Sequence, residues 1–351
     1  MIVFFHFNFQ GSGTIAGTWA VQKGWLFVDF FFVLSGFVLT HAYWSRIGYE
    51  VSPWRFLGLR LGRIYPLHLG VLAAMLVLEV ALLVSNGSLA SREAFAGDRS
   101  LEGLLASVLL LHSSNTTDGL VWNTPSWSIA AEFWAYVLFA LIAVSGRMWL
   151  FAMAGAAALG MMLLTEPDLH YVTDRFGTAR CVYGFSLGVL LCAWVDVPRL
   201  GRWTATLAET LMIAAVCGFT TYVWQGWPTL FGPPLFAITV LVFAGEGGLI
   251  SRLLKTRPFL TLGLLSYSIY MVHPFVQARL MEGLAPLGWA VTGAPDRLTV
   301  GGEAADGLTL LMLAVVIAVA AMTYRWIERP VRDWSRRKLQ STNVEAAAPA
   351  F

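Results

Sequence analysis

Acidic and imidazole side chains inside long apolar stretches are the residues of this chain best suited to chemistry. Glu132 lies in NTPSWSIAAEFWAYVLF, His6 in VFFHFNF and His273 in SYSIYMVHPF. Ionisable groups are costly in such surroundings and usually mark a functional site. An imidazole accepts and returns a proton near neutral pH, and a carboxylate can orient it. These three residues therefore predict a proton-transfer site.

Depth along the predicted spans places two of these residues at one level. Glu132 lies roughly 13 Å below the outer end of its span, and His273 lies roughly 20 Å above the inner end of its own, at ~1.5 Å per residue. In a hydrocarbon core of about 30 Å these depths nearly coincide. Asp29 is shallower, about 6 Å below the outer boundary. Glu79, near the end of its span, is interpreted as a structural carboxyl.

A second group of polar residues lies in the segment SPWRFLGLRLGRIYPLH. Arg60 and Arg63 are three residues apart, so they share one face of a helix. Two guanidinium groups at a helix end offer bidentate donors to a phosphate or diphosphate. The alternative is that they only set topology and bind lipid headgroups. Spacing alone favours neither interpretation.

Long apolar stretches must position these groups. The chain is 57% hydrophobic and 13% charged, whereas soluble domains carry about 25% charged residues. We predict ten spans, and interpret Leu101–Leu111 as a re-entrant or interfacial segment. The predicted spans are residues 1–10, 25–44, 67–85, 126–145, 148–165, 178–195, 206–224, 229–245, 261–281 and 307–327. All but the first are long enough to cross a bilayer, which needs roughly 17 to 25 residues.

Basic residues are concentrated in alternate gaps between the spans. Sixteen of the 23 Lys and Arg residues fall in one set of gaps, and seven, including Arg180, fall in the other set. Because basic residues are retained on the cytoplasmic side, both termini are predicted to be cytoplasmic. The expected fold is an all-α, polytopic transmembrane helical bundle. Residues 1–333 form its membrane domain, and residues 334–351 form a disordered cytoplasmic tail.

Several function classes find no support in the sequence. The net charge of +2 is spread over topology determinants and forms no basic stripe, so nucleic acid is not an expected partner. Cys181, Cys192 and Cys217 match no metal or redox spacing and are expected to be packing residues. No metal site, GxSxG nucleophile elbow or P-loop is found.

The ordered motifs resemble those of the acyltransferase 3 family of integral membrane acyltransferases. These enzymes O-acylate surface polysaccharides, peptidoglycan and other acceptors with a cytoplasmic acyl-CoA donor. The matching elements, in order, are FFHF with His6, GWLFVDFFFVLSGF at 24–37, the Arg60 and Arg63 pair followed by IYP, PSWSIAAEFWAYVLF with Trp127, Ser128 and Glu132, SYSIYMVHPF at 266–275, and WIERPVR.

The resemblance implies roles for individual residues. His6 matches the family's essential histidine, Arg60 and Arg63 match its RxxR pair, and Glu132 matches the acidic position of its WSxxxE segment. Family members usually have an Arg eleven residues before that histidine, whereas only five residues precede His6. We therefore expect the protein's start to lie upstream.

The resemblance also implies substrates and a location. Acyl-CoA, as acetyl-CoA in the commonest case, is the co-substrate, with no bound cofactor. A glycan or lipid-linked sugar is the acceptor, and membrane lipid is the other partner. The expected location is the bacterial inner membrane, as a multi-pass protein.

The mechanism expected from these residues is transfer of an acyl group to a hydroxyl. Arg60 and Arg63 dock the phosphates of acyl-CoA at the inner face, and His6 is the base that takes the hydroxyl proton. A covalent acyl-imidazole on His6 remains an alternative. Glu132 orients the imidazole or relays protons. The candidates for binding or supporting the acceptor are Asp29, Trp127, Tyr270 and His273.

Two other classes of function remain open at the level of sequence. Ten spans with buried His and Glu residues and helix breakers such as Gly232, Pro233 and Pro234 suit a proton-coupled secondary transporter. No internal repeat relates the two halves, which counts against a carrier. The third class is a structural partner in a polysaccharide export complex. This class predicts that substitution of His6 is harmless.

Overall fold

Helices form nearly all regular structure in the computed structural model, which describes residues 1–7, 14–15, 17–85, 93–284 and 302–345. Across these ranges no β-strand occurs, apart from an isolated bridge between Ile47 and Val51. Eight helical segments are long and apolar enough to cross a membrane. A further apolar helix, Trp149–Thr165, has 17 residues. The all-helical, multi-pass class expected from the sequence is confirmed.

Most helices coincide with predicted spans, but the count of ten spans is not confirmed by the eight candidate segments and the shorter helix Trp149–Thr165. Their bounds are α1 Ile2–His6, α2 Trp19–Gln22, α3 Phe27–Tyr43, α4 Pro53–Val84, α5 Leu101–Val108, α6 Trp127–Ser145, α7 Trp149–Thr165, α8 Gly177–Trp194, α9 Arg202–Tyr222, α10 Gly232–Ala244, α11 Leu249–Leu254, α12 Arg257–Leu284, α13 Gly302–Thr323 and α14 Arg329–Glu345. Short 3-10 turns precede α3, α6 and α10.

The two ends of the chain differ from expectation. The predicted first span is represented by α1, which has five residues; residues 8–10 lie outside the described ranges. The predicted disordered tail from residue 334 is helical as far as Glu345, and residues 346–351 are not described. The tail is ordered because α13 continues through a π-helical turn, Tyr324–Glu328, into α14, and α14 packs against α4.

Helices α3 and α8 form the closest pair in the bundle because two glycines let their backbones meet. A Cβ at Gly36 would collide with the carbonyl oxygen of Phe185, and a Cβ at Gly188 would collide with that of Val33. Small residues allow this close approach between membrane helices. The contact fixes the start of α3, which carries Asp29, beside the start of α8, which carries Arg180.

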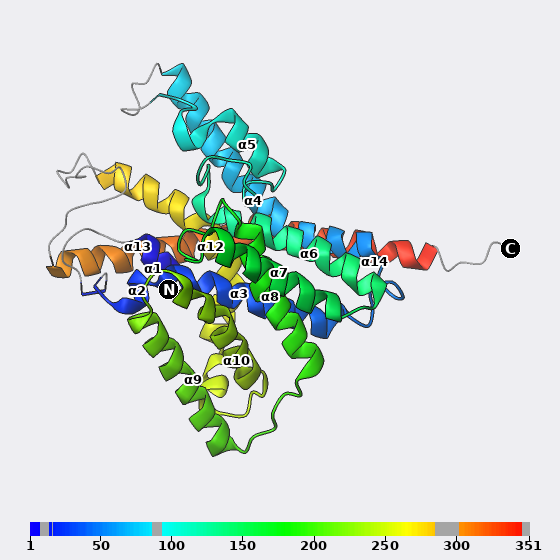
Figure 1. The fold of residues 1–351 in the computed structure, drawn as a ribbon. Helices are drawn as coiled ribbons and strands as arrows, with labels where there is room; N and C mark the ends of the chain where they lie inside the picture. The colour runs from blue at the N-terminus through cyan, green and yellow to red at the C-terminus, as the bar shows by residue number, and fades with distance from the viewer. Residues whose placement is uncertain (8–13, 16, 86–92, 285–301, 346–351) are drawn as a thin grey trace.

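One end of the bundle is rich in arginine. Ser52 caps the N-terminus of α4 and Pro53 occupies its first turn, so this helix begins 14 residues before the span predicted at residue 67. Arg60 and Arg63 therefore lie on the first turns of α4. Figure 1 shows α14 beside the start of α4, on the side of the molecule away from α1 and α2. We call this end the arginine-rich face.

Candidate active site

Two imidazoles from distant parts of the sequence meet in the structure. The ring centroids of His6 in α1 and His273 in α12 lie 4.9 Å apart. Gln277, one turn beyond His273, donates a 2.7 Å hydrogen bond to the carbonyl oxygen of His6 and so ties α1 to α12. His273 is fully buried. The short helix α1 is therefore held where its histidine faces a second buried histidine.

The orientation of His273 follows from the proline beside it. Pro274 has no N–H, so the carbonyl of Tyr270 four residues earlier lacks its helical donor. Nδ1 of His273 donates to that carbonyl oxygen at 2.7 Å. A carbonyl oxygen only accepts, so the proton lies on Nδ1. Nε2 of His273 is buried without a hydrogen-bond partner among the described residues.

Helix α6 begins against the same part of α12. The hydroxyl groups of Ser128 and Tyr270 lie 2.7 Å apart, and Tyr270 also donates to the carbonyl oxygen of Pro125 at 2.9 Å. The amide of Asn123 donates to the carbonyl oxygen of Met271 at 3.1 Å. These bonds hold the start of α6 against Tyr270, whose ring lies 5.9 Å, between centroids, from that of His273.

A polar stripe runs along α6 from this contact toward the arginine-rich face. Ser128, Glu132 and Tyr136 are spaced four residues apart, so they share one face of the helix over ~12 Å. Glu132 interacts with the Tyr136 hydroxyl and acts electrostatically on Tyr270. Tyr136 in turn lies within electrostatic range of Arg60. The structure places His273, rather than Glu132, against His6.

The arginine pair predicted from the sequence lines a pocket of about 230 Å³ at the arginine-rich face. Arg60 donates a 3.0 Å hydrogen bond to the Tyr43 hydroxyl and stacks over that ring. Arg63 is exposed at the rim. Two arginines of α14, Arg332 and Arg336, complete the lining. The sequence interpretation did not include them in the site: Arg332 was counted only among the residues that set topology, and Arg336 fell in the segment expected to be disordered, 334–351.

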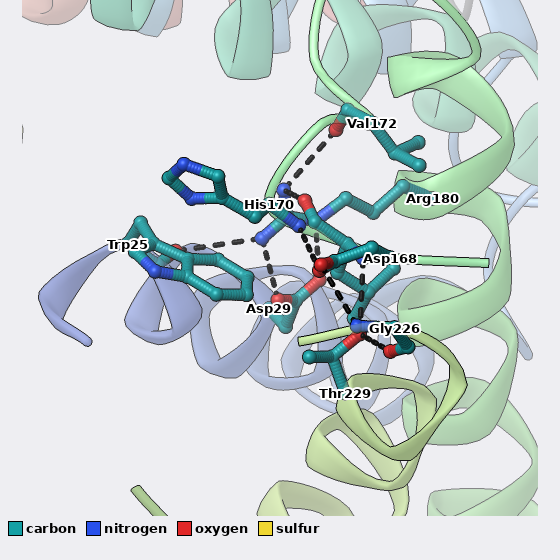
Figure 2. Close-up of polar contacts among 9 residues, drawn as sticks. Trp25, Asp29, Asp168, His170, Val172, Arg180, Gly226 and Thr229 are labelled. Carbon is teal, nitrogen blue, oxygen red and sulfur yellow. Dashed lines mark hydrogen bonds and ion pairs between the residues drawn. The ribbon is translucent and has the colours of Figure 1, made fainter. Parts of the chain in front are cut away.

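Asp29 forms a buried ion pair with Arg180, as Figure 2 shows. Both of its carboxylate oxygens accept hydrogen bonds from Arg180, at 2.9 and 2.7 Å, and both side chains are fully buried. Arg180 also donates to the carbonyl oxygens of Leu169 and Val172, and its guanidinium lies 5.2 Å from the centre of the Trp127 ring. Asp29 and Trp127 therefore support the start of α6 through Arg180.

The segment that follows α7 closes over this ion pair. Asp168 accepts hydrogen bonds from the backbone N–H groups of His170 and Gly226, and Thr229 accepts one from the N–H of Leu169. These contacts are drawn in Figure 2. Partial burial lowers the pKa of His170 below its usual value, so a neutral imidazole packs against Trp25 with ring centroids 5.0 Å apart.

A second buried histidine pair lies behind the start of α6 and was not singled out from the sequence. The rings of His68 and His112 are parallel, with centroids 6.0 Å apart. Nε2 of His112 lies 2.9 Å from the hydroxyl oxygen of Ser126. Burial, together with the neighbouring His68, lowers the pKa of His112 to about 4. This neutral pair anchors the turn that leads into α6.

Comparisons with known proteins agree with this architecture. The family model described as an acyltransferase domain, that of the acyltransferase 3 family, matches residues 1–325. The chain is 29% identical to acyltransferase MdmB of Streptomyces mycarofaciens over 92% of its own length and 85% of that protein. It is 21% identical to peptidoglycan O-acetyltransferase OatA of Listeria monocytogenes, over 94% of this chain and 53% of OatA.

No solved structure matches the chain. The family match covers nearly the whole sequence and includes both the histidine pair and the arginine pair of α4. The chain therefore belongs to the acyltransferase 3 family and is a multi-pass membrane enzyme that transfers acyl groups.

Proposed function

We propose that this protein transfers an acyl group from acyl-CoA, bound at the arginine-rich face, to a hydroxyl of a glycan or lipid-linked sugar near the opposite face. The observation that carries the proposal is the polar stripe of α6, which begins at Ser128, bonded to Tyr270 of α12, and ends at Tyr136, within electrostatic range of Arg60. An acetyl group and a glycan acceptor are favoured because OatA is named a peptidoglycan O-acetyltransferase. The excess of basic residues makes the arginine-rich face the cytoplasmic one, with α14 on that side and α1 away from it (Figure 1).

In this mechanism His6 is the general base. It takes the proton of the acceptor hydroxyl while the hydroxyl oxygen attacks the carbonyl carbon of the thioester. The C–S bond breaks, and the proton passes from His6 to the leaving CoA thiolate. A positioned base of this kind contributes about 10²- to 10⁴-fold to the rate. The hydroxyls of Ser128 and Tyr270, which donate to the carbonyl oxygen of Pro125 in this structure, could stabilise the oxyanion only by turning away from that carbonyl.

His273 is a positioning residue for His6. Its Nδ1 proton is held by the carbonyl of Tyr270, and its Nε2 has no hydrogen-bond partner among the described residues, so the lone pair of Nε2 is free to accept the N–H of His6 during the reaction, from a ring whose centroid lies 4.9 Å away. The opposite ring nitrogen of His6 is then the basic one. Glu132 keeps its proposed role as a proton relay, through Tyr136 rather than by direct contact with His6.

The test is acyl transfer by the full chain in lipid nanodiscs, with labelled acetyl-CoA as donor and peptidoglycan or other surface glycans as acceptors. We expect His6→Ala to lower transfer and CoA release by about 100-fold or more, with the KM for the donor unchanged. His41→Ala is the matched control, because His41 is an exposed histidine near the C-terminal end of α3, on a different helix from His6.

Three results would contradict this assignment. Undiminished transfer by a folded His6→Ala variant would remove His6 from the chemistry. Accumulation of a substrate in vesicles, driven by a proton gradient and without CoA release, would favour the transporter alternative. Label retained on His6 when the acceptor is omitted would replace direct transfer with the acyl-imidazole route.

A further inference from the structure

Helix α14 forms the second wall of the arginine pocket. Arg332 and Arg336 are one turn apart on α14 and face Arg60 and Arg63 of α4 across about 230 Å³ of space. Four guanidinium groups thus converge from two helices near opposite ends of the sequence. Like charges repel one another, so such a cluster is stable only with anions nearby.

The carboxylates around the pocket neutralise only part of this charge. Arg332 lies 3.8 Å from Glu328 and 3.6 Å from Asp333. Within the described ranges, no carboxylate lies within ion-pair distance of Arg60, Arg63 or Arg336. Nε of Arg60 is also buried without a hydrogen-bond partner among those residues. The pocket therefore presents unpaired donors to an anion.

The sequence of α4 contains the surface that receives α14. A Cβ at Gly62 would lie 2.7 Å from Cβ of Ser335, and one at Gly58 would lie 3.1 Å from Cδ1 of Leu339. The residues at 332, 335, 336 and 339 form a single face of α14, so the contact that seats Ser335 and Leu339 also aims both arginines into the pocket.

The π-helical turn before α14 sets this face. A π-turn inserts one residue, which rotates the following helix by about 100° relative to a continuous α-helix. Glu328, the last residue of the turn, accepts a 2.7 Å hydrogen bond from Ser268 of α12 and is almost fully buried. The rotation is thus fixed by contact with the bundle rather than left to the end of the chain.

We propose that α4 and α14 together bind the nucleotide part of CoA, a diphosphate ester with a separate 3′-phosphate on its ribose. This inference rests on the acyl-CoA donor of the proposed function. Arg60 and Arg332 form the inner pair, because Arg60 is half-buried and the Arg332 side chain is 18% exposed. Arg63 and Arg336 are exposed and form the rim pair.

The order of groups in CoA matches these two pairs. The diphosphate lies between the ribose phosphate and the pantetheine arm that carries the acyl group. Arg60 lies within electrostatic range of Tyr136, the last residue of the polar stripe of α6, so the inner pair holds the diphosphate and the arm enters along the stripe. The rim pair, Arg63 and Arg336, binds the 3′-phosphate. The site thereby distinguishes CoA from nucleotides that lack this phosphate.

The test measures binding of CoA and of 3′-dephospho-CoA to the full chain in nanodiscs of phosphatidylcholine. Without an acyl group neither probe turns over. A lost bidentate contact to a charged group corresponds to about tenfold in affinity. We expect wild-type protein to prefer CoA by about tenfold, Arg336→Gln to abolish this preference, and Arg332→Gln to weaken both probes about equally.

Arg337→Gln is the matched control on α14, because Arg337 is exposed and bonds only to the carbonyl oxygen of Asp333 in its own helix. It is expected to bind both probes as wild type does. Arg336→Lys, which keeps the charge but not the bidentate geometry, is expected to recover part of the preference. Thermal unfolding of each variant confirms that it is folded.

A folded Arg336→Gln variant that keeps the tenfold preference would overturn the inference. A second contradicting result would come from nanodiscs that contain phosphatidylglycerol. If Arg332 and Arg336 retain that lipid and CoA fails to displace it, the pocket binds lipid headgroups rather than CoA. Acyl transfer measured in parallel separates the two proposals. If the wild-type protein transfers acyl groups while the α14 variants bind CoA normally, only the proposed role of α14 in CoA binding is wrong. Arginine-dependent CoA binding without transfer from any acyl-CoA would instead refute the proposed function.

Discussion

At the scale of single residues, Pro274 determines which ring nitrogen of His273 carries the proton. Because Pro274 leaves the Tyr270 carbonyl without its helical donor, His273 supplies the missing proton from Nδ1. The sequence pointed to His6 and His273 because an imidazole in an apolar segment is unusual. It did not show that their rings meet, because no local pattern relates residues at opposite ends of the chain.

Arg180 shows a different limit of sequence reasoning. Counting basic residues by gap assigned it to an outer loop, although it is fully buried in the structure. A signal for it was present: Asp29 lies in an apolar run, and a buried carboxylate needs a cation or several donors. Arg180 lies in the first turn of α8, a later apolar helix that begins on the same side of the membrane as α3, which makes it a natural partner.

The buried pair of Asp29 and Arg180 makes a testable prediction about stability. Asp29→Ala leaves a buried guanidinium without its counter-ion, so the free energy of unfolding is expected to fall by about 3–5 kcal/mol. Replacing both charges, with Asp29→Leu and Arg180→Met, is expected to cost less than Asp29→Ala alone. The measurement is the thermal unfolding midpoint in detergent.

A matched control for this prediction lies near the same end of α8. Asp118 and Arg175 form an exposed ion pair at 3.9 Å, and Asp118→Ala is expected to leave the midpoint unchanged because exposed pairs contribute little. If the double replacement were as unstable as Asp29→Ala, the unpaired charge would not be the cause.

At the scale of helices, close glycine contacts decide which elements become neighbours. Most of the spans could be predicted from hydropathy, because most long helices cover an apolar stretch, although α4 extends 14 residues before its own. Helix α14 was missed because its sequence, RPVRDWSRRKLQ, is polar and resembles a solvated tail. Its order comes from the surface of α4 at Gly58 and Gly62, which no local propensity reveals.

The seat of α14 on α4 provides a prediction for these helices. Gly62→Ala places a methyl group against Ser335, and overpacking of this kind typically costs about 1–3 kcal/mol. We expect the variant to weaken CoA binding by up to about tenfold, and Ser335→Gly in the same chain to restore it by making room. CoA binding in nanodiscs is the readout.

Gly160→Ala on α7 is the control for this pair, since no neighbouring atom lies within 4 Å of a Cβ at that position. It should bind CoA normally. Failure of Ser335→Gly to rescue Gly62→Ala, with both variants folded, would show that the methyl group acts by some route other than displacing α14.

At the scale of the whole molecule, the two candidate substrate sites lie toward opposite ends of one bundle. The arginine pocket opens at the end where α14 lies, and α1 with His6 lies on the other side of the molecule (Figure 1). Charge asymmetry predicted an arginine-rich side and hydropathy predicted the spans. The connection between the two sites arises only when α4, α6 and α12 pack together, so it required the structure.

This arrangement makes the sidedness of the reaction the central claim. The direct measurement uses sealed proteoliposomes in which a tag on the C-terminus reports orientation, with a glycan acceptor on one side and labelled acetyl-CoA on the other. We predict transfer only when acetyl-CoA is on the side of α14, and its loss with His6→Ala. Equal transfer with acetyl-CoA supplied on the opposite side would contradict the account.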